Sequence, residues 1–136
     1  MITHSPEETM AIARKLAKGI ENGGIICLFG DLGSGKTVFS QGLAAGLGVE
    51  EFFVKSPTYT YIREYRSQKH TIFHIDLYRL ETIDELLLRE IMELMENKKN
   101  IIIIEWAEKL TNYLPENCIK VHFNYLDENS REIQAT

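Results

Sequence analysis

The chain has 136 residues, with a hydrophobic fraction of 44%, a charged fraction of 26% and a formal net charge of −5 at pH 7. These values are typical of a soluble globular protein, and the length predicts one domain, over residues 1–136, with a single good core. The negative net charge argues against a protein that binds nucleic acid by itself, because contact with the phosphate backbone requires a basic face.

The sequence carries no pattern of export or of membrane insertion. No apolar stretch approaches the length that spans a bilayer, and the first residues, "MITH", lack a signal-peptide pattern. Cys27 lies in an expected core strand and Cys118 lies far along the chain, so the two cysteines do not make a disulfide framework. We therefore expect a cytoplasmic protein with no membrane association.

The first element predicted along the chain is a helix. Ser5, Pro6 and Glu8 match a capping box with proline at the first helical position. Apolar residues then recur at helical spacing, at Ile12, Ala13, Leu16, Ala17 and Ile20. The segment "NGG" at residues 22–24 ends this helix.

A glycine-rich loop, "GDLGSGKT" at residues 30–37, follows and matches the phosphate-binding pattern G-x-x-x-x-G-K-[ST]. The apolar run at 25–29 predicts a buried strand before the loop, and helical periodicity follows it. Glycines let the backbone turn tightly and bring its N–H groups against phosphate oxygens at the start of a helix. Lys36 would reach the β- and γ-phosphates, and the Thr37 hydroxyl would hold Mg²⁺.

The middle of the chain predicts two antiparallel strands. Residues 58–62 and 71–75 are rich in β-formers, and the polar segment 66–69 suits the turn between them. The densest basic stretch, residues 63–70, is expected as a solvated loop.

The last third of the chain predicts one helix and several strands. "TIDE" at residues 82–85 matches a second capping box and opens an apolar-faced helix. The isoleucine run at 101–104 predicts a strand buried on both faces, and alternation over 119–125 precedes a turn and a closing strand. The expected fold is a three-layer α/β domain whose mixed parallel and antiparallel sheet is flanked by helices.

Two acids stand where expected strands end, which is the usual place for groups that serve a nucleotide. Glu105 follows the isoleucine run, and Asp76 follows the strand at 71–75. Both are expected to act in hydrolysis, and Glu105 is favoured as the magnesium ligand, although the sequence does not decide between them. The Asp76 carboxylate could instead form a local ion pair. His74 is expected to be a packed or hydrogen-bonded residue that orients Asp76. Arg79 could act on phosphate as an internal arginine finger, or form a structural salt bridge or a partner contact.

Four segments carry a resemblance to a known family. In the order "GDLGSGKT", "SPTYTYIREY", "HIDLYRL" and "IIIEWAEKL", they resemble the TsaE (YjeE) family over nearly the whole chain. The resemblance implies a P-loop NTPase-like fold and an ATPase component of bacterial threonylcarbamoyladenosine (t6A) synthesis at position 37 of tRNA. It further implies ATP and Mg²⁺ as cofactors, TsaB and TsaD as partner proteins, and contact with tRNA only through that complex.

The resemblance also implies roles for individual residues. The residues expected to wrap the phosphates are Gly33, Ser34, Gly35, Lys36, Thr37 and Val38. Thr37 and Glu105 would hold Mg²⁺, and Asp76 would act near the γ-phosphate as a second acid or a water-orienting group. Thr58 would sense the γ-phosphate, Trp106 would lie beside the nucleotide, and Thr9 would lie near the base. Many relatives have threonine at position 38 and alanine at position 34, but neither change affects the lysine or the metal-binding hydroxyl.

The favoured function is therefore an ATPase that drives or resets the TsaB–TsaD complex. A small P-loop kinase is a second class, but it needs an acceptor pocket and usually an Arg-rich lid, for which the chain has little room. A non-catalytic, ATP-dependent docking switch is a third class. The guanine-selecting pattern N-K-x-D is absent, since "NKKN" at 97–100 ends in asparagine, so ATP is the expected nucleotide.

Overall fold

The computed structural model describes residues 1–31, 33–49 and 61–136, and all structural statements below concern these residues. Its strands are β1 (Ile2–Thr3), β2 (Gly24–Phe29), β3 (Ile62–Arg66), β4 (Thr71–Asp76), β5 (Ile101–Glu105), β6 (Ile119–Tyr125) and β7 (Arg131–Ala135). Its α-helices are α1 (Pro6–Ala17), α2 (Lys36–Gly46) and α3 (Glu85–Glu96), and two 3₁₀ segments are η1 (Lys18–Ile20) and η3 (Ala107–Tyr113). None of the helices in the described residues combines the length and the hydrophobicity that a bilayer span requires.

The strands form one mixed sheet in the order β1-β7-β6-β2-β5-β4-β3. The central strands β6, β2, β5 and β4 run parallel to one another. Both edges are antiparallel, with β3 against β4 on one side and β7 against β6 and β1 on the other. The expected mixed sheet is therefore confirmed, and the carboxyl ends of the parallel strands share one edge.

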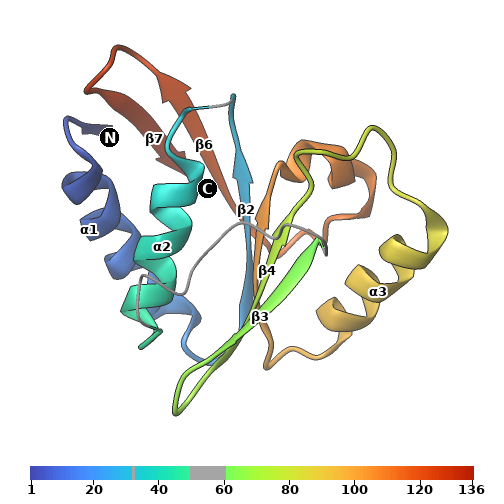
Figure 1. The fold of residues 1–136 in the computed structure, drawn as a ribbon. Coiled ribbons are helices and arrows are strands. Elements are labelled where there is room, and N and C mark those ends of the chain that lie inside the picture. Colours follow the sequence, from blue (N-terminus) through green and yellow to red (C-terminus); the bar gives the residue numbers. More distant parts are fainter. Residues whose placement is uncertain (32, 50–60) are drawn as a thin grey trace.

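Helices cover both faces of this sheet. Figure 1 shows α1 and α2 on one side and α3 on the other. The isoleucine run of β5 serves both layers: Ile101 and Ile103 pack in the cluster with α1 and α2, whereas Ile102 and Ile104 pack in the cluster with α3 and η3. A strand buried on both faces has no polar alternation, which explains why the run is continuous. Cys27 and Cys118 lie buried in the second cluster as free thiols.

Helix starts follow the capping signals, with one shift. The Ser5 hydroxyl accepts the N–H of Glu8 at 3.1 Å, and Pro6 begins α1 as expected. In the second box the N-cap is Asp84 rather than Thr82, because its carboxylate accepts the N–H of Leu87 at 2.8 Å. Asp and Thr both cap well, so the choice between them depends on where the loop before α3 ends.

The expected solvated loop at 63–70 is wrong for its first half. Residues 58–60 lie outside the described part of the chain, and β3 covers Ile62–Arg66, so the strand takes up the first half of the basic stretch. Tyr65 is buried against the sheet, while Glu64 and Arg66 form an exposed ion pair. An edge strand tolerates such charged residues because one of its faces meets water.

Small residues let α1 and α2 approach closely. A Cβ added at Gly42 would lie 2.7 Å from the Cβ of Ala13 and 2.8 Å from the carbonyl oxygen of Met10. A Cβ added at Gly46 would lie 2.8 Å from the Cβ of Ala17. This contact sets the position of α2, and α2 carries the phosphate-binding loop at its amino end.

We predict that Gly42→Ala destabilises the protein by about 1–3 kcal/mol, because the steric overlap outweighs the better helix propensity of alanine. Gly19→Ala is the matched control, since a Cβ there meets nothing within 4 Å. Urea denaturation measures both variants. Equal stability of Gly42→Ala and the wild type would contradict the close approach of the two helices.

Candidate nucleotide-binding site

The amino end of α2 is built to receive an anion. Gly35, its N-cap residue, has φ 104°, a left-handed conformation that glycine adopts without steric cost. Among the described residues no side chain caps this helix, so its first N–H groups are open to a ligand. Together with the positive end of the helix dipole, these groups make a site for phosphate.

A cavity of about 340 Å³ opens at this helix end. It is lined by Gly33, Ser34, Gly35, Lys36, Thr37, Val38, Asp76, Tyr78, Glu105, Trp106 and Arg131. The structure thus brings together all the expected site residues except Thr9 and Thr58. Thr9 is buried in α1, where its hydroxyl contacts that of Thr3 at 2.9 Å, and Thr58 lies outside the described residues.

A larger cavity, of about 480 Å³, lies at the opposite edge of the sheet. It is bordered by the starts of β2 and β5 and by the carboxyl-terminal end of α3. Ligands of open α/β sheets bind outside the carboxyl ends of the strands, where the smaller cavity lies. The candidate site is therefore the smaller cavity, which the phosphate-binding loop lines, although the other cavity has the larger volume.

Lys36 lies inside the smaller cavity without a salt bridge among the described residues. Its Nζ donates to the carbonyl oxygens of Gly30 and Asp31, and it lies 3.6 Å from the centre of the Trp106 ring. Burial lowers the pKa of Lys36, and nearby acids, Glu108 first, oppose this effect. Carbonyl oxygens and an aromatic face leave the positive charge available to an incoming phosphate.

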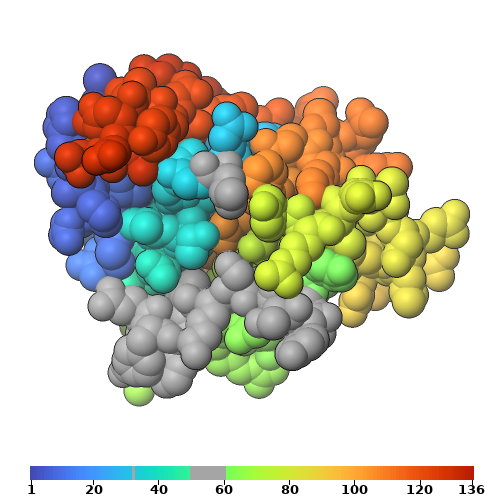
Figure 2. All heavy atoms as spheres, turned by 45° about the horizontal axis from the view of Figure 1, so that its top comes forward, coloured from blue at the N-terminus to red at the C-terminus, as the bar shows by residue number. Residues whose placement is uncertain are grey.

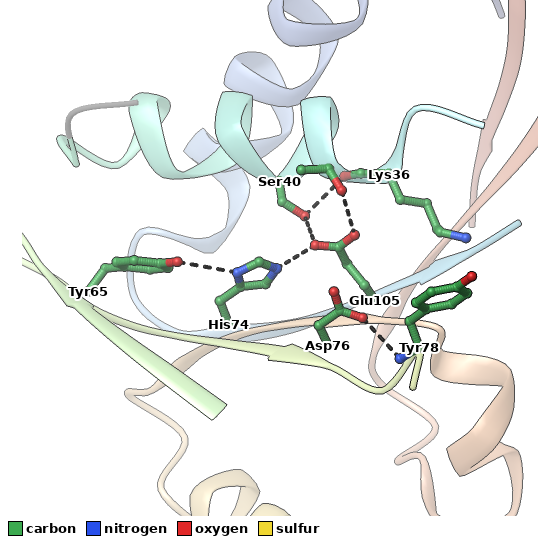
Figure 3. A network of polar contacts seen from close by, with 8 residues as sticks. Lys36, Ser40, Tyr65, His74, Asp76, Tyr78 and Glu105 are labelled. Atoms are coloured by element: carbon green, nitrogen blue, oxygen red, sulfur yellow. Dashed lines mark hydrogen bonds and ion pairs between the residues drawn. The ribbon is translucent and has the colours of Figure 1, made fainter. Parts of the chain in front are cut away.

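Glu105, the last residue of β5, is 2% exposed and is held by three side chains. Its Oε1 accepts from the Thr37 hydroxyl at 3.2 Å, and its Oε2 accepts from His74 Nε2 (Figure 3). Oε2 also lies 3.3 Å from the Ser40 hydroxyl, whose single hydrogen is shared with the carbonyl oxygen of Lys36 at 3.1 Å. Burial alone would raise the pKa of Glu105, but the hydrogen bonds and charge of His74, with the two hydroxyls, hold it below its usual value. Glu105 is therefore a buried carboxylate that stays ionised.

Asp76 lies beside Glu105, because the two residues pair across β4 and β5. Its Oδ1 accepts the backbone N–H of Tyr78 at 3.0 Å, and among the described residues it forms no ion pair. The expectation that His74 orients Asp76 is wrong: His74 contacts Glu105 instead. This hydrogen bond to the loop after β4 directs the Asp76 carboxylate away from His74 (Figure 3).

Trp106 connects this loop to the lysine. It has φ 60° and ψ 44°, which is rare for a bulky residue and costs free energy that the surrounding contacts must offset. Its ring packs on Tyr78, with centroids 5.1 Å apart. Lys109 holds the Tyr78 loop by donating to the carbonyl oxygens of Leu77 and Tyr78, each at 2.7 Å.

Sequence reasoning missed Ser40 and Arg131. Ser40 follows Thr37 by three residues, so both face the same way on α2, and this helical spacing could have indicated it. Arg131 comes from β7, and its Nε donates to the carbonyl oxygen of Gly33 at 3.2 Å. No local signal indicates this contact, which depends on the pairing of β6 and β7 (red in Figure 2, beside α1 in blue). Arg79 is exposed and does not line the cavity.

The donors in the cavity fit a magnesium–triphosphate ligand. Mg²⁺ prefers oxygen ligands, and the Thr37 hydroxyl and the carboxylates of Glu105 and Asp76 supply them. The Ser34 hydroxyl is buried and has no hydrogen-bond partner among the described residues, so it can take a polar atom from a ligand. Helix N–H groups and Lys36 supply the complementary positive charge.

Comparison with known proteins finds one family over nearly the whole chain. The family model described as "Threonylcarbamoyl adenosine biosynthesis protein TsaE" matches residues 3–133. A TsaE protein of Bacillus subtilis is 37% identical over 135 residues, covering 98% of this chain and 82% of the relative. A TsaE protein of Nostoc sp. is 42% identical over 132 residues, covering 96% of this chain and 80% of the relative.

A solved structure has the same fold. The crystal structure of YdiB from Bacillus subtilis superposes with a TM-score of 0.72 at 31% sequence identity. The match covers 98% of this chain and 80% of that chain. The whole mixed sheet and both helical layers therefore have a solved counterpart.

We predict that Glu105 makes stability depend on pH in the acidic range. Because its folded pKa lies below the unfolded value of about 4.3, its contribution is present above that pH and is lost as the pH falls through the folded pKa. The free energy of unfolding of the wild type should therefore fall more steeply than that of Glu105→Gln between about pH 5 and about pH 3. Denaturant titrations at several pH values measure the slopes.

Glu116→Gln, which changes an exposed glutamate, serves as the control for this comparison. It should keep the pH slope of the wild type. If Glu105→Gln kept that slope as well, the ionised state of Glu105 would be assigned incorrectly.

Proposed function

The chain belongs to the TsaE family, and on this basis we propose that it is a P-loop ATPase that acts in threonylcarbamoyladenosine synthesis on tRNA. It would bind ATP with Mg²⁺ and hydrolyse it to drive or reset a complex of TsaB and TsaD. The observation that carries this proposal is one contact: the Thr37 hydroxyl at the amino end of α2 donates to Glu105 at the end of β5.

This contact joins the two parts that a P-loop enzyme needs, a phosphate-binding loop and a carboxylate for the metal. Residues 33–38 would surround the phosphates through backbone N–H groups, and Lys36 would move from the carbonyl oxygens of Gly30 and Asp31 to the phosphate oxygens. Thr37 and Glu105 would hold Mg²⁺, which when bound neutralises phosphate charge.

Asp76 would act on the attacking water. It lines the cavity next to Glu105, and its carboxylate is held through a single hydrogen bond to a backbone N–H. The oxygen not used in that bond can accept a hydrogen bond from water. Thr58 and Thr9 keep the roles that the family resemblance implies, as a γ-phosphate sensor and a neighbour of the base.

Partner proteins complete the proposed reaction. The net charge of −5 gives the chain little attraction for tRNA on its own, so tRNA would be engaged through the TsaB–TsaD complex. Threonylcarbamoyl transfer would then belong to the partners, and ATP hydrolysis to this chain.

We predict that Lys36→Ala, Glu105→Ala and Asp76→Ala each lower ATP hydrolysis in the reconstituted complex by about 100-fold or more, because each removes a charge that acts on phosphate, metal or water. Lys98→Ala, an exposed lysine at the opposite edge of the sheet, should keep full activity. Phosphate release with and without TsaB and TsaD measures the effect.

The same assay separates the alternatives. Transfer of phosphate to a small acceptor would identify a kinase, and nucleotide binding without phosphate release would identify a docking switch. Full activity of Asp76→Ala would show that its assigned role is wrong.

We also predict that Arg131→Ala weakens ADP binding by about tenfold, as expected when a charged hydrogen-bonding group at a binding site is removed. Arg131 lines the cavity and contacts Gly33, so it both shapes the loop and adds positive charge. Arg79→Ala should change the affinity by less than about twofold, because Arg79 is exposed outside the cavity. Calorimetric titration measures the ADP affinity of both variants. A larger loss of affinity in Arg79→Ala than in Arg131→Ala would show that Arg79, not Arg131, serves the nucleotide site.

A further inference from the structure

The two oxygens of the Glu105 carboxylate have different partners. Among the described residues, Oε2 accepts from His74 and lies within reach of the shared Ser40 hydroxyl, whereas Oε1 accepts from Thr37. Thr37 is itself an expected metal ligand, so Oε1 is the oxygen that faces the metal position. Oε2 is committed to protein donors on the side away from it.

His74 is fully buried on β4, between the strand that carries Glu105 and the edge strand β3. Its Nδ1 lies 3.5 Å from the hydroxyl of Tyr65 on β3, which is at the long limit of a hydrogen bond. Tyr65, His74 and Glu105 therefore form a line across three adjacent strands, beneath α2 (Figure 3).

The direction of the hydrogen bonds follows from the groups involved. An ionised carboxylate only accepts, so His74 must carry a hydrogen on Nε2. The other ring nitrogen, Nδ1, faces the Tyr65 hydroxyl, a group that can both donate and accept. The orientation of the ring is thus supported at both nitrogens.

We propose that His74 is a positioning residue for the magnesium site: with Ser40 it holds Oε2, so that Oε1 stays directed at the metal beside Thr37. The two carboxylate oxygens are chemically equivalent, and the terminal torsion of glutamate is broad and roughly two-fold. Hydrogen-bond donors on one oxygen restrict rotation of the Glu105 carboxylate before any ligand binds. This inference rests on the proposed function, because it concerns the same metal.

A purely structural histidine would have a different signature. Outer partners of metal ligands typically change metal affinity by about 10–100-fold when they are mutated. Since His74 is absent from the cavity lining, its loss should not alter nucleotide contacts made without metal. The metal-dependent part of nucleotide binding is therefore the quantity that separates positioning from general support of the fold.

The experiment is calorimetric titration of ADP into the full chain, with Mg²⁺ and with EDTA. The variants are His74→Leu, which removes both ring nitrogens, and His74→Gln, whose amide can still donate to Oε2. His122→Leu is the control for loss of a strand histidine outside the site, since His122 is exposed and its ring stacks on that of Phe29, with centroids 4.7 Å apart. Thermal melts establish that each variant is folded.

We expect His74→Leu to lose about tenfold or more of the Mg²⁺-dependent gain in affinity, while its affinity in EDTA stays within about twofold of the wild type. His74→Gln should recover most of that gain, and His122→Leu should match the wild type. An unchanged gain in His74→Leu, or an equal loss of affinity with and without Mg²⁺, would overturn the proposal.

A second measurement needs neither nucleotide nor metal and covers the case in which His74→Leu does not fold. The ¹⁵N NMR spectrum of the wild type should show the His74 hydrogen on Nε2, and Tyr65→Phe should shift the Nδ1 resonance. A neutral ring with its hydrogen only on Nδ1 would overturn the proposal. Absence of ADP binding by the folded wild type would instead refute the proposed function, and leave the NMR result to decide the role of His74.

Discussion

The site depends on one buried, ionised carboxylate. An isolated charge in the interior is costly, so Glu105 persists only because Thr37, Ser40 and His74 donate to it. These donors come from α2 and β4, whereas the acid comes from β5. The same hydrogen bonds therefore offset the desolvation free energy of the carboxylate and hold the phosphate-binding helix against the sheet. Any change in the position of α2 would also change the surroundings of Glu105.

The fold supplies the positions that this network requires. Parallel pairing of β4 with β5 places Asp76 beside Glu105 at the carboxyl edge of the sheet, and β2 delivers the glycine-rich loop to the same edge. Gly42 and Gly46 allow α1 and α2 to pack closely, which sets the position of α2. On the open side, β7 brings Arg131 to the loop, and Trp106, the residue before η3, lies beside Lys36. Residues far apart in sequence thus converge on a helix end.

Local patterns predicted the parts of the site that are local. The phosphate loop has a fixed spacing between strand and helix, and acids at strand ends follow the general geometry of parallel sheets. The fold class followed from the order of elements. What local patterns missed are contacts set by pairing register: His74 bonds to Glu105 and not to Asp76, and Arg131 reaches Gly33 through the β6–β7 hairpin. The edge strand β3 was misplaced because its charged residues resemble a loop when its neighbour is unknown.

The central claim is that Glu105 uses one oxygen for the protein and the other for the metal. A crystal structure of the chain with ADP and Mn²⁺, located by its anomalous signal, tests this most directly. The account predicts the ion next to the Thr37 hydroxyl and Glu105 Oε1, directly or through one water, with Oε2 still bonded to His74 and Ser40. An ion bound by Asp76 and away from Glu105, or a carboxylate that has left His74 to reach the metal, would contradict it.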